Sequence, residues 1–174
     1  MSDLQTLVQL LEKNKALQKR IGDVEHLETP ATIVARYTTN AGQSIPNNAH
    51  TIVDFGTLVY DTHSAVTTGA AWHFHAPVGG YYAISVAILF AATTTWADAE
   101  IGEIDLYKNG ARFSVIERKD NYGTASTVYM QLGSSDVVYL AANETLDIRI
   151  FQNSGAALAL YSEHPYNYVS IHKV

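Results

Sequence analysis

The sequence contains no cysteine, which excludes a disulfide framework and a thiolate metal site. Charged residues make up only 16% of its 174 residues and give a formal net charge of −6. That charge disfavours a nucleic-acid partner, because such affinity comes largely from Lys and Arg. Apolar runs stay short of the roughly 18 residues of a membrane-spanning helix, and the N-terminus does not resemble an ordinary secretory signal. With 47% hydrophobic residues, we expect one sizeable core and no membrane insertion.

The sequence also lacks the motifs that mark common catalytic sites. It contains no G-x-S-x-G elbow, no Gly-rich phosphate loop after a strand and no H-E-x-x-H. Glu100, Glu103 and Asp105 are close enough to suggest acid–base chemistry on glycosides, but their alternation favours a solvated or interfacial strand face. We therefore predict that the protein is not an enzyme and uses no cofactor.

Residues 1–29 are expected to form a helical stalk or anchor, with the helix running from Leu4 to Leu27. Apolar residues recur there at alternating spacings of three and four, a 3.5-residue repeat typical of a coiled coil. The seam is predicted to contain Leu7, Leu10, Asn14, Leu17, Ile21 and Val24. Asn14 would fix the register of the helices at some cost in stability. The alternative is an amphipathic helix that packs on its own domain, and Pro30 ends either form.

Residues 30–174 are expected to form a single all-β head. Short segments rich in Val, Ile, Tyr and Thr alternate there with turn signals. Strands are predicted near 32–38, 55–61, 70–76, 80–92, 100–109, 111–119, 126–132, 136–142, 144–152, 157–163 and 166–174. This pattern predicts an antiparallel sandwich or barrel.

One stretch of the head, FHAPVGGYYAIS, resembles the signature of the C1q and tumour-necrosis-factor-like (TNF-like) domains. Phe74, Pro77, Gly80 and Tyr82 occupy the motif positions F-x-A-P-x-x-G-x-Y. The segments VDFGTLVYDT, LYKNG and VVYLAANETLDIRI resemble flanking segments of that family in the same order. The chain departs from the family at Asn143-Glu144, where Gly-Asp is common, and at Ser170, where Gly is frequent. The resemblance covers roughly residues 45–174.

The resemblance implies a ten-stranded antiparallel jelly-roll sandwich that assembles as a homotrimer. A trimeric coiled coil at residues 1–29 would agree with that assembly. The chain lacks the collagen-like stem and the cysteines of animal members, so it looks more like fibre, tip or head-decoration proteins of bacteriophages. We therefore expect a virion protein that attaches to a host surface, or alternatively a capsid decoration trimer. Its N-terminal segment would contact other virion proteins, and a host glycan or protein would be the ligand.

His73 and His75 form an H-x-H pair that also suggests the metal site of a cupin, another jelly roll. A cupin needs a glycine six residues before the first histidine and a glutamate four or five after the second. Here these positions hold Thr67 and the two glycines 79 and 80. We therefore predict that the histidines pack structurally, with an ion at a trimer axis as a weaker alternative. A cupin-like metalloenzyme and a bacterial adhesin are the rival functions.

Aromatic and polar residues in predicted loops are the candidate ligand contacts. Loops on a rigid scaffold commonly carry binding residues, and aromatic rings can stack on sugars while Asn and Asp bind hydroxyls. The candidates are Trp96, Asp120, Asn121, Tyr122 and Tyr166. Each ring could equally pack beneath its own loop.

Overall fold

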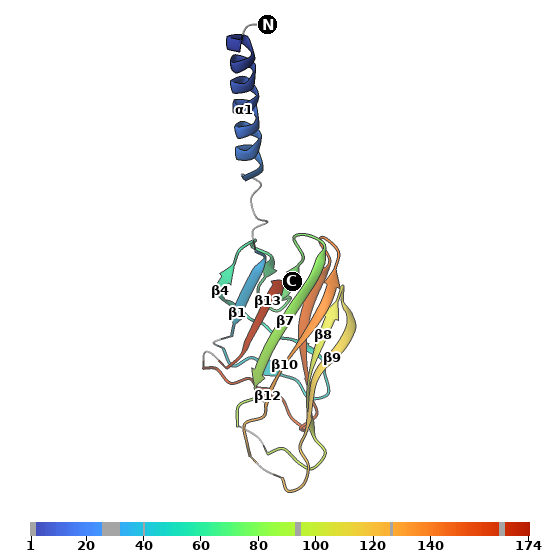
Figure 1. Cartoon of the computed structure of the whole chain (residues 1–174). Coiled ribbons are helices and arrows are strands. Elements are labelled where there is room, and N and C mark those ends of the chain that lie inside the picture. Colours follow the sequence, from blue (N-terminus) through green and yellow to red (C-terminus); the bar gives the residue numbers. More distant parts are fainter. Residues whose placement is uncertain (1–2, 26–31, 40, 93–94, 126, 164–165) are drawn as a thin grey trace. The chain divides into compact units, whose positions relative to one another are not determined.

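A computed structural model describes residues 3–25, 32–39, 41–92, 95–125, 127–163 and 166–174. The chain divides into two compact units, Met1–Thr32 and Ile33–Val174. The first contains helix α1, Asp3–Glu25 (Figure 1). Asp3 lies in the first turn, where a negative charge interacts favourably with the helix dipole. The helix agrees with the predicted one, whose last two residues lie outside the described ranges. No described helix is long and apolar enough to cross a membrane.

The second unit is built from two main antiparallel sheets. The five-stranded sheet has the order β10-β7-β13-β1-β4. Its strands are β10 (Gln131–Leu140), β7 (Gly80–Leu89), β13 (Tyr168–Lys173), β1 (Val34–Thr38) and β4 (Thr57–Asp61). In Figure 1, β13 lies between β1 and β7, so the first and last strands of this unit are neighbours.

The six-stranded sheet has the order β5-β6-β11-β8-β9, and β3 also pairs with β11. Its strands are β5 (Val66–Thr67), β6 (His73–His75), β11 (Thr145–Gln152), β8 (Ile101–Lys108), β9 (Ala111–Asp120) and β3 (Thr51–Ile52). A separate pair joins β2 (Ser44–Ile45) to β12 (Leu158–Ala159). All these pairings are antiparallel, as the short strands and tight connections predict.

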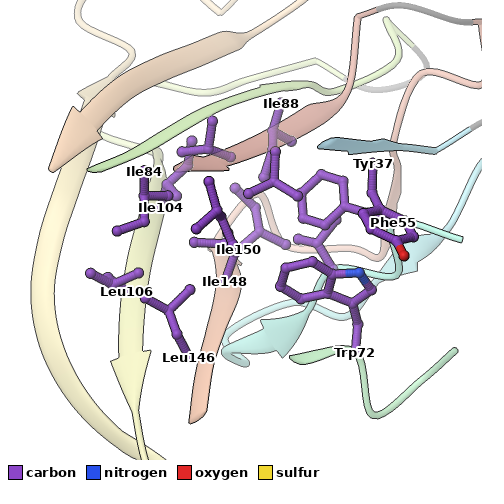
Figure 2. Packing of buried hydrophobic residues seen from close by; sticks show 14 of the residues in the cluster. Tyr37, Phe55, Trp72, Ile84, Ile88, Ile104, Leu106, Leu146, Ile148 and Ile150 are labelled. Carbon is purple, nitrogen blue, oxygen red and sulfur yellow. The ribbon is translucent and has the colours of Figure 1, made fainter. Parts of the chain in front are cut away.

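The core lies between the two sheets, where the inward side chains of successive strands meet. Leu146, Ile148 and Ile150 alternate along β11 and are fully buried, as period-two alternation requires. They pack with Ile84 and Ile88 of β7 in the cluster shown in Figure 2. Burying each such side chain stabilises the fold by roughly 1.5–3 kcal/mol, so these alternating runs position both sheets.

The motif residues lie where the chain passes from the six-stranded sheet to the five-stranded one. Phe74 of β6 and Tyr82 of β7 are fully buried and form an edge-to-face pair with ring centroids 5.4 Å apart. The Tyr82 hydroxyl donates a 2.7 Å hydrogen bond to the Val78 carbonyl, which holds the turn. A Cβ at Gly80 would lie 2.5 Å from Cε of Lys173, so a larger residue would displace that side chain. The motif therefore stabilises the crossover.

The structure corrects the predicted strands in two places. Strands expected at 126–132 and 136–142 are replaced by one continuous strand, β10. The segment GSSD, expected to form a turn, instead pairs with β7 from Gly133↔Ala87 to Asp136↔Ile84. The described residues contain thirteen strands rather than the eleven predicted ranges. Two of those ranges become β10, and the two-residue strands β2, β3 and β5 are additional because they have too few residues to show an alternating pattern.

Candidate association surfaces

Around β7, the outward face of the five-stranded sheet is formed largely by small residues between aromatic ends. At one end, Tyr81 of β7 and Tyr139 of β10 are directly paired, with ring centroids 5.4 Å apart. Farther along, Ser85 is flanked by Ser135 on one side and Ser170 on the other. Such small side chains would let another protein surface approach the backbone closely.

A hollow of about 250 Å³ lies at the opposite end of β7, lined by Leu89, Tyr129, Gln131, Tyr161 and Tyr166. The ring of Tyr161 is edge-on to Tyr129 and Tyr166, with centroid distances of 5.4 and 5.2 Å. A hydrogen bond with the Glu163 side chain raises the pKa of the Tyr161 hydroxyl. The three rings therefore form one aromatic wall of this hollow.

A second exposed apolar patch lies on β9, the final strand in the six-stranded path. Phe113 and Val115 expose about half of their surface there. This edge, with Phe113 and Val115, differs in composition from the tyrosine-flanked face of β7 and β10. We call these two patches together the association surfaces; β4 exposes a further apolar run, Leu58 to Tyr60.

Helix α1 exposes a third apolar surface. Leu7, Leu10 and Leu17 of the predicted seam are exposed, and Leu4, Val8 and Leu11 extend the stripe. Asn14 is also exposed and lies at the intervening seam position. The side chains of Ile21 and Val24 lie outside the described set, so the seam is defined structurally only as far as Leu17.

The structure separates the predicted loop ligands into buried and exposed residues. The expectation that Trp96 is a surface contact is wrong: its side chain is fully buried and packs edge-on against Phe90, with centroids 5.5 Å apart. Asn121 donates hydrogen bonds to the Trp96 and Ala97 carbonyls, and Asp120 accepts one from Arg118. The polar group of Asn121 therefore serves its own loop, and that of Asp120 serves β9.

Tyr122 and Tyr166 remain accessible candidates, with Tyr122 being 79% exposed. His73 and His75 are half-buried on β6, while the intervening Phe74 is buried. His73 Nδ1 contacts the Ala71 carbonyl oxygen at 2.8 Å. These histidines belong to the six-stranded sheet rather than to the tyrosine-flanked face.

No family model and no curated protein matches the chain. Solved structures do match. The structure of Eiger TNF from S. frugiperda has a TM-score of 0.59 and 16% identity, covering 82% of this chain and 92% of that one. Murine APRIL at pH 8.0 gives a TM-score of 0.57 and 14% identity, covering 82% of this chain and 99% of that one. The chain therefore has an antiparallel β-sandwich of the TNF/C1q-like jelly-roll type, which confirms that part of the sequence prediction.

Proposed function

We propose that the protein is a non-enzymatic homotrimer on the surface of a bacteriophage particle, where it attaches the particle to its host. The observation that carries the proposal is that the two association surfaces, on β7 and β10 and on β9, differ in composition. Patches of this kind favour a head-to-tail contact, in which the edge of one copy packs on the face of the next. If the rotation closes, the product is a ring in which both association surfaces are covered.

Both the fold and the helix favour an assembly of three chains. The TNF/C1q-like resemblance implies a trimer, and the widened apolar stripe of α1 suits a bundle of more than two helices. The helix is also marginal as an isolated monomer in water, so association would stabilise it. Both units of the chain therefore favour the same kind of assembly.

The proposed role at the host surface relies on residues that a ring would leave accessible. Tyr122 projects from the loop after β9, where an aromatic ring can stack on a sugar. A capsid decoration trimer is the alternative role, with α1 holding the shell. Immunogold labelling of intact particles distinguishes the two, because label confined to the tail would exclude the decoration role.

Assembly is tested on the full chain by light scattering. We expect a mass of three chains for the unchanged protein. Val137→Arg places a charge on the tyrosine-flanked face, and Phe113→Arg places one on the β9 edge, so each should yield monomers or weakly associated chains. Tyr122→Arg is the matched control and should keep the trimeric mass. A monomeric unchanged protein, or an unchanged mass for both patch variants, would exclude the proposed ring.

A further inference from the structure

Two acidic residues are buried beneath the outer surface of the six-stranded sheet. Glu103 and Asp105 are two positions apart on β8, so their side chains emerge on the same face. Asp105 is fully buried and Glu103 is 6% exposed. His50 reaches this pair from the segment before β3, and its Nδ1 lies 2.6 Å from Asp105 Oδ2. We call His50, Glu103 and Asp105 the carboxylate–histidine cluster.

The three side chains converge closely enough to share one ion. One nitrogen or oxygen atom from each residue lies within 4.8 Å of the corresponding atoms of the other two. Among the described residues, no donor forms a hydrogen bond with Asp105 Oδ1. The Arg112 guanidinium, 2.7 Å from this oxygen, offsets its charge without a hydrogen bond. A buried carboxylate oxygen without a hydrogen bond is costly, and a metal ion in place of the guanidinium would coordinate it directly.

Arg112 of β9 offsets part of the negative charge of Glu103 and Asp105. Its Nη2 lies 2.5 Å from Glu103 Oε1 and 2.7 Å from Asp105 Oδ1, although the second contact lacks hydrogen-bond geometry. One guanidinium beside two carboxylates leaves the cluster with a net negative charge when His50 is neutral. The neighbouring Arg118 is 3.9 Å from Glu103 and bonds Asp120 at 3.1 Å.

We propose that His50, Glu103 and Asp105 bind a zinc ion, with Arg112 turning toward solvent as the ion enters. Imidazole nitrogen and carboxylate oxygen are both ordinary zinc ligands, and three protein ligands leave one position for water. The imidazole disfavours Ca²⁺ and Mg²⁺, which take oxygen ligands. The Arg112 side chain is 39% exposed, so a path to solvent is open to it.

The surroundings hold the histidine ring in place for this role. The His50 ring packs on Phe151 of β11, with centroids 4.9 Å apart and planes inclined by 32°. It also lies 6.3 Å from the ring of Tyr107 on β8. Zinc would thus connect the segment before β3 to β8 through an already oriented ligand. This proposal does not depend on the proposed assembly.

Zinc binding is measured on the full, tag-free chain after chelator treatment, by equilibrium dialysis with elemental analysis and by titration calorimetry. We expect about one Zn²⁺ per chain, and a raised thermal unfolding midpoint because an ion that binds only the folded state stabilises it. His50→Ala should weaken binding by at least about tenfold. His75→Ala, the matched control on β6, should leave the affinity unchanged. Arg112→Met should strengthen binding because it removes the competing cation.

Circular dichroism establishes that each variant is folded. Glu103→Gln tests a second ligand with little change of shape, and should weaken binding as His50→Ala does. Titration with Co²⁺ gives an independent reading, since a visible absorption band should appear with the unchanged chain and be lost in His50→Ala. No stoichiometric Zn²⁺ in the unchanged chain, equal affinity in His50→Ala, or loss of binding in His75→Ala alone would each overturn the assignment.

Discussion

The outward faces of the two sheets of the head differ in which side chains they expose and which they bury. On the five-stranded sheet, the rows around β7 present serines, alanines and tyrosines, and Tyr81 and Tyr139 are more than half exposed. On the six-stranded sheet, Asp105 and Asp147 are buried beside Arg112 and Arg149. The first face leaves tyrosine rings accessible, whereas the second buries carboxylates in ion pairs with arginine. The two faces of one small head therefore differ in the kind of side chain that they expose.

The largest expected change in stability distinguishes the inward side of β7 from its outward side. Tyr82→Ala removes a fully buried ring and should lower the free energy of unfolding by about 3–5 kcal/mol. Tyr81→Ala is the matched control on the other side of the strand. Tyr81→Ala should leave the core intact, and should instead weaken the assembly so that it dissociates more readily on dilution. Chemical denaturation and light scattering measure the two effects, and similar losses of stability in both variants would contradict the assigned sides.

A smaller effect concerns Tyr37 of β1, which is buried on the inward side of the five-stranded sheet. Burial and a 3.1 Å hydrogen bond to Asp61 raise the pKa of its hydroxyl from 10.0 to about 12. The unfolded chain therefore loses this proton first as pH rises. The stabilisation is fully present below pH 10 and is lost between pH 10 and 12, by about 2 kcal/mol.

Denaturation of the unchanged chain and of Tyr37→Phe across that pH window isolates this contribution. The difference in stability between the two should shrink as pH rises from 10 to 12. Tyr122→Phe, at an exposed site, should parallel the unchanged chain. A constant difference between Tyr37→Phe and the unchanged chain would show that Tyr37 does not titrate as its surroundings indicate.

On the outward face of the six-stranded sheet, loss of the Arg149–Asp147 pair should lower the free energy of unfolding by about 1–2 kcal/mol. Arg149 Nε donates a 2.7 Å hydrogen bond to Asp147 Oδ1, and its guanidinium lies 3.8 Å from the centroid of the Tyr107 ring. The hydrogen bond with Asp147 is the main cause that raises the pKa of Arg149. Arg149→Met should lower stability because Asp147 loses its partner. The exposed Arg118→Met is the control, and an equal loss there would indicate a general effect of net charge.

The smallest expected effect is a change in the free energy of association caused by a substitution in α1. Asn14→Ile replaces a polar seam position and should stabilise association of the full chain by about 1 kcal/mol. Lys13→Ala, off the seam, should change association little. Analytical ultracentrifugation over a concentration series measures both. Weaker association of Asn14→Ile would show that the heptad positions are wrongly assigned.

The sequence predicts much of this fold because its alternation is local information. Ile148 and Ile150 indicate their strand and its buried face without any knowledge of their partners. Gly133 and Asp136 mislead because small polar residues are typical of turns, whereas β7 supplies ten paired positions that keep β10 extended. Cross-strand pairing, which is not local, overrides the turn signal there.

The carboxylate–histidine cluster could not be predicted for the same reason. Glu103 and Asp105 alone indicate a solvated strand face, and their burial depends on Arg112 across a hairpin with two register shifts. His50 precedes Asp105 by 55 positions. Trp96 likewise shows a loop composition, yet Asn121, 25 positions later, binds its carbonyl.

The pairing of β1 with β13 determines how the head would respond to a mechanical load. Val34 is opposite His172, and the Lys173 amide donates to the Ile33 carbonyl, so β1 begins beside the residue where β13 ends. A pull applied between residue 33 and the C-terminus would peel these hydrogen bonds apart one after another, as a zipper opens. A pull on residue 33 against the far end of β13 would instead shear all the bonds together. The β1–β13 pair would therefore resist tension better when the load is applied at the Tyr168 end of β13 than at the C-terminus.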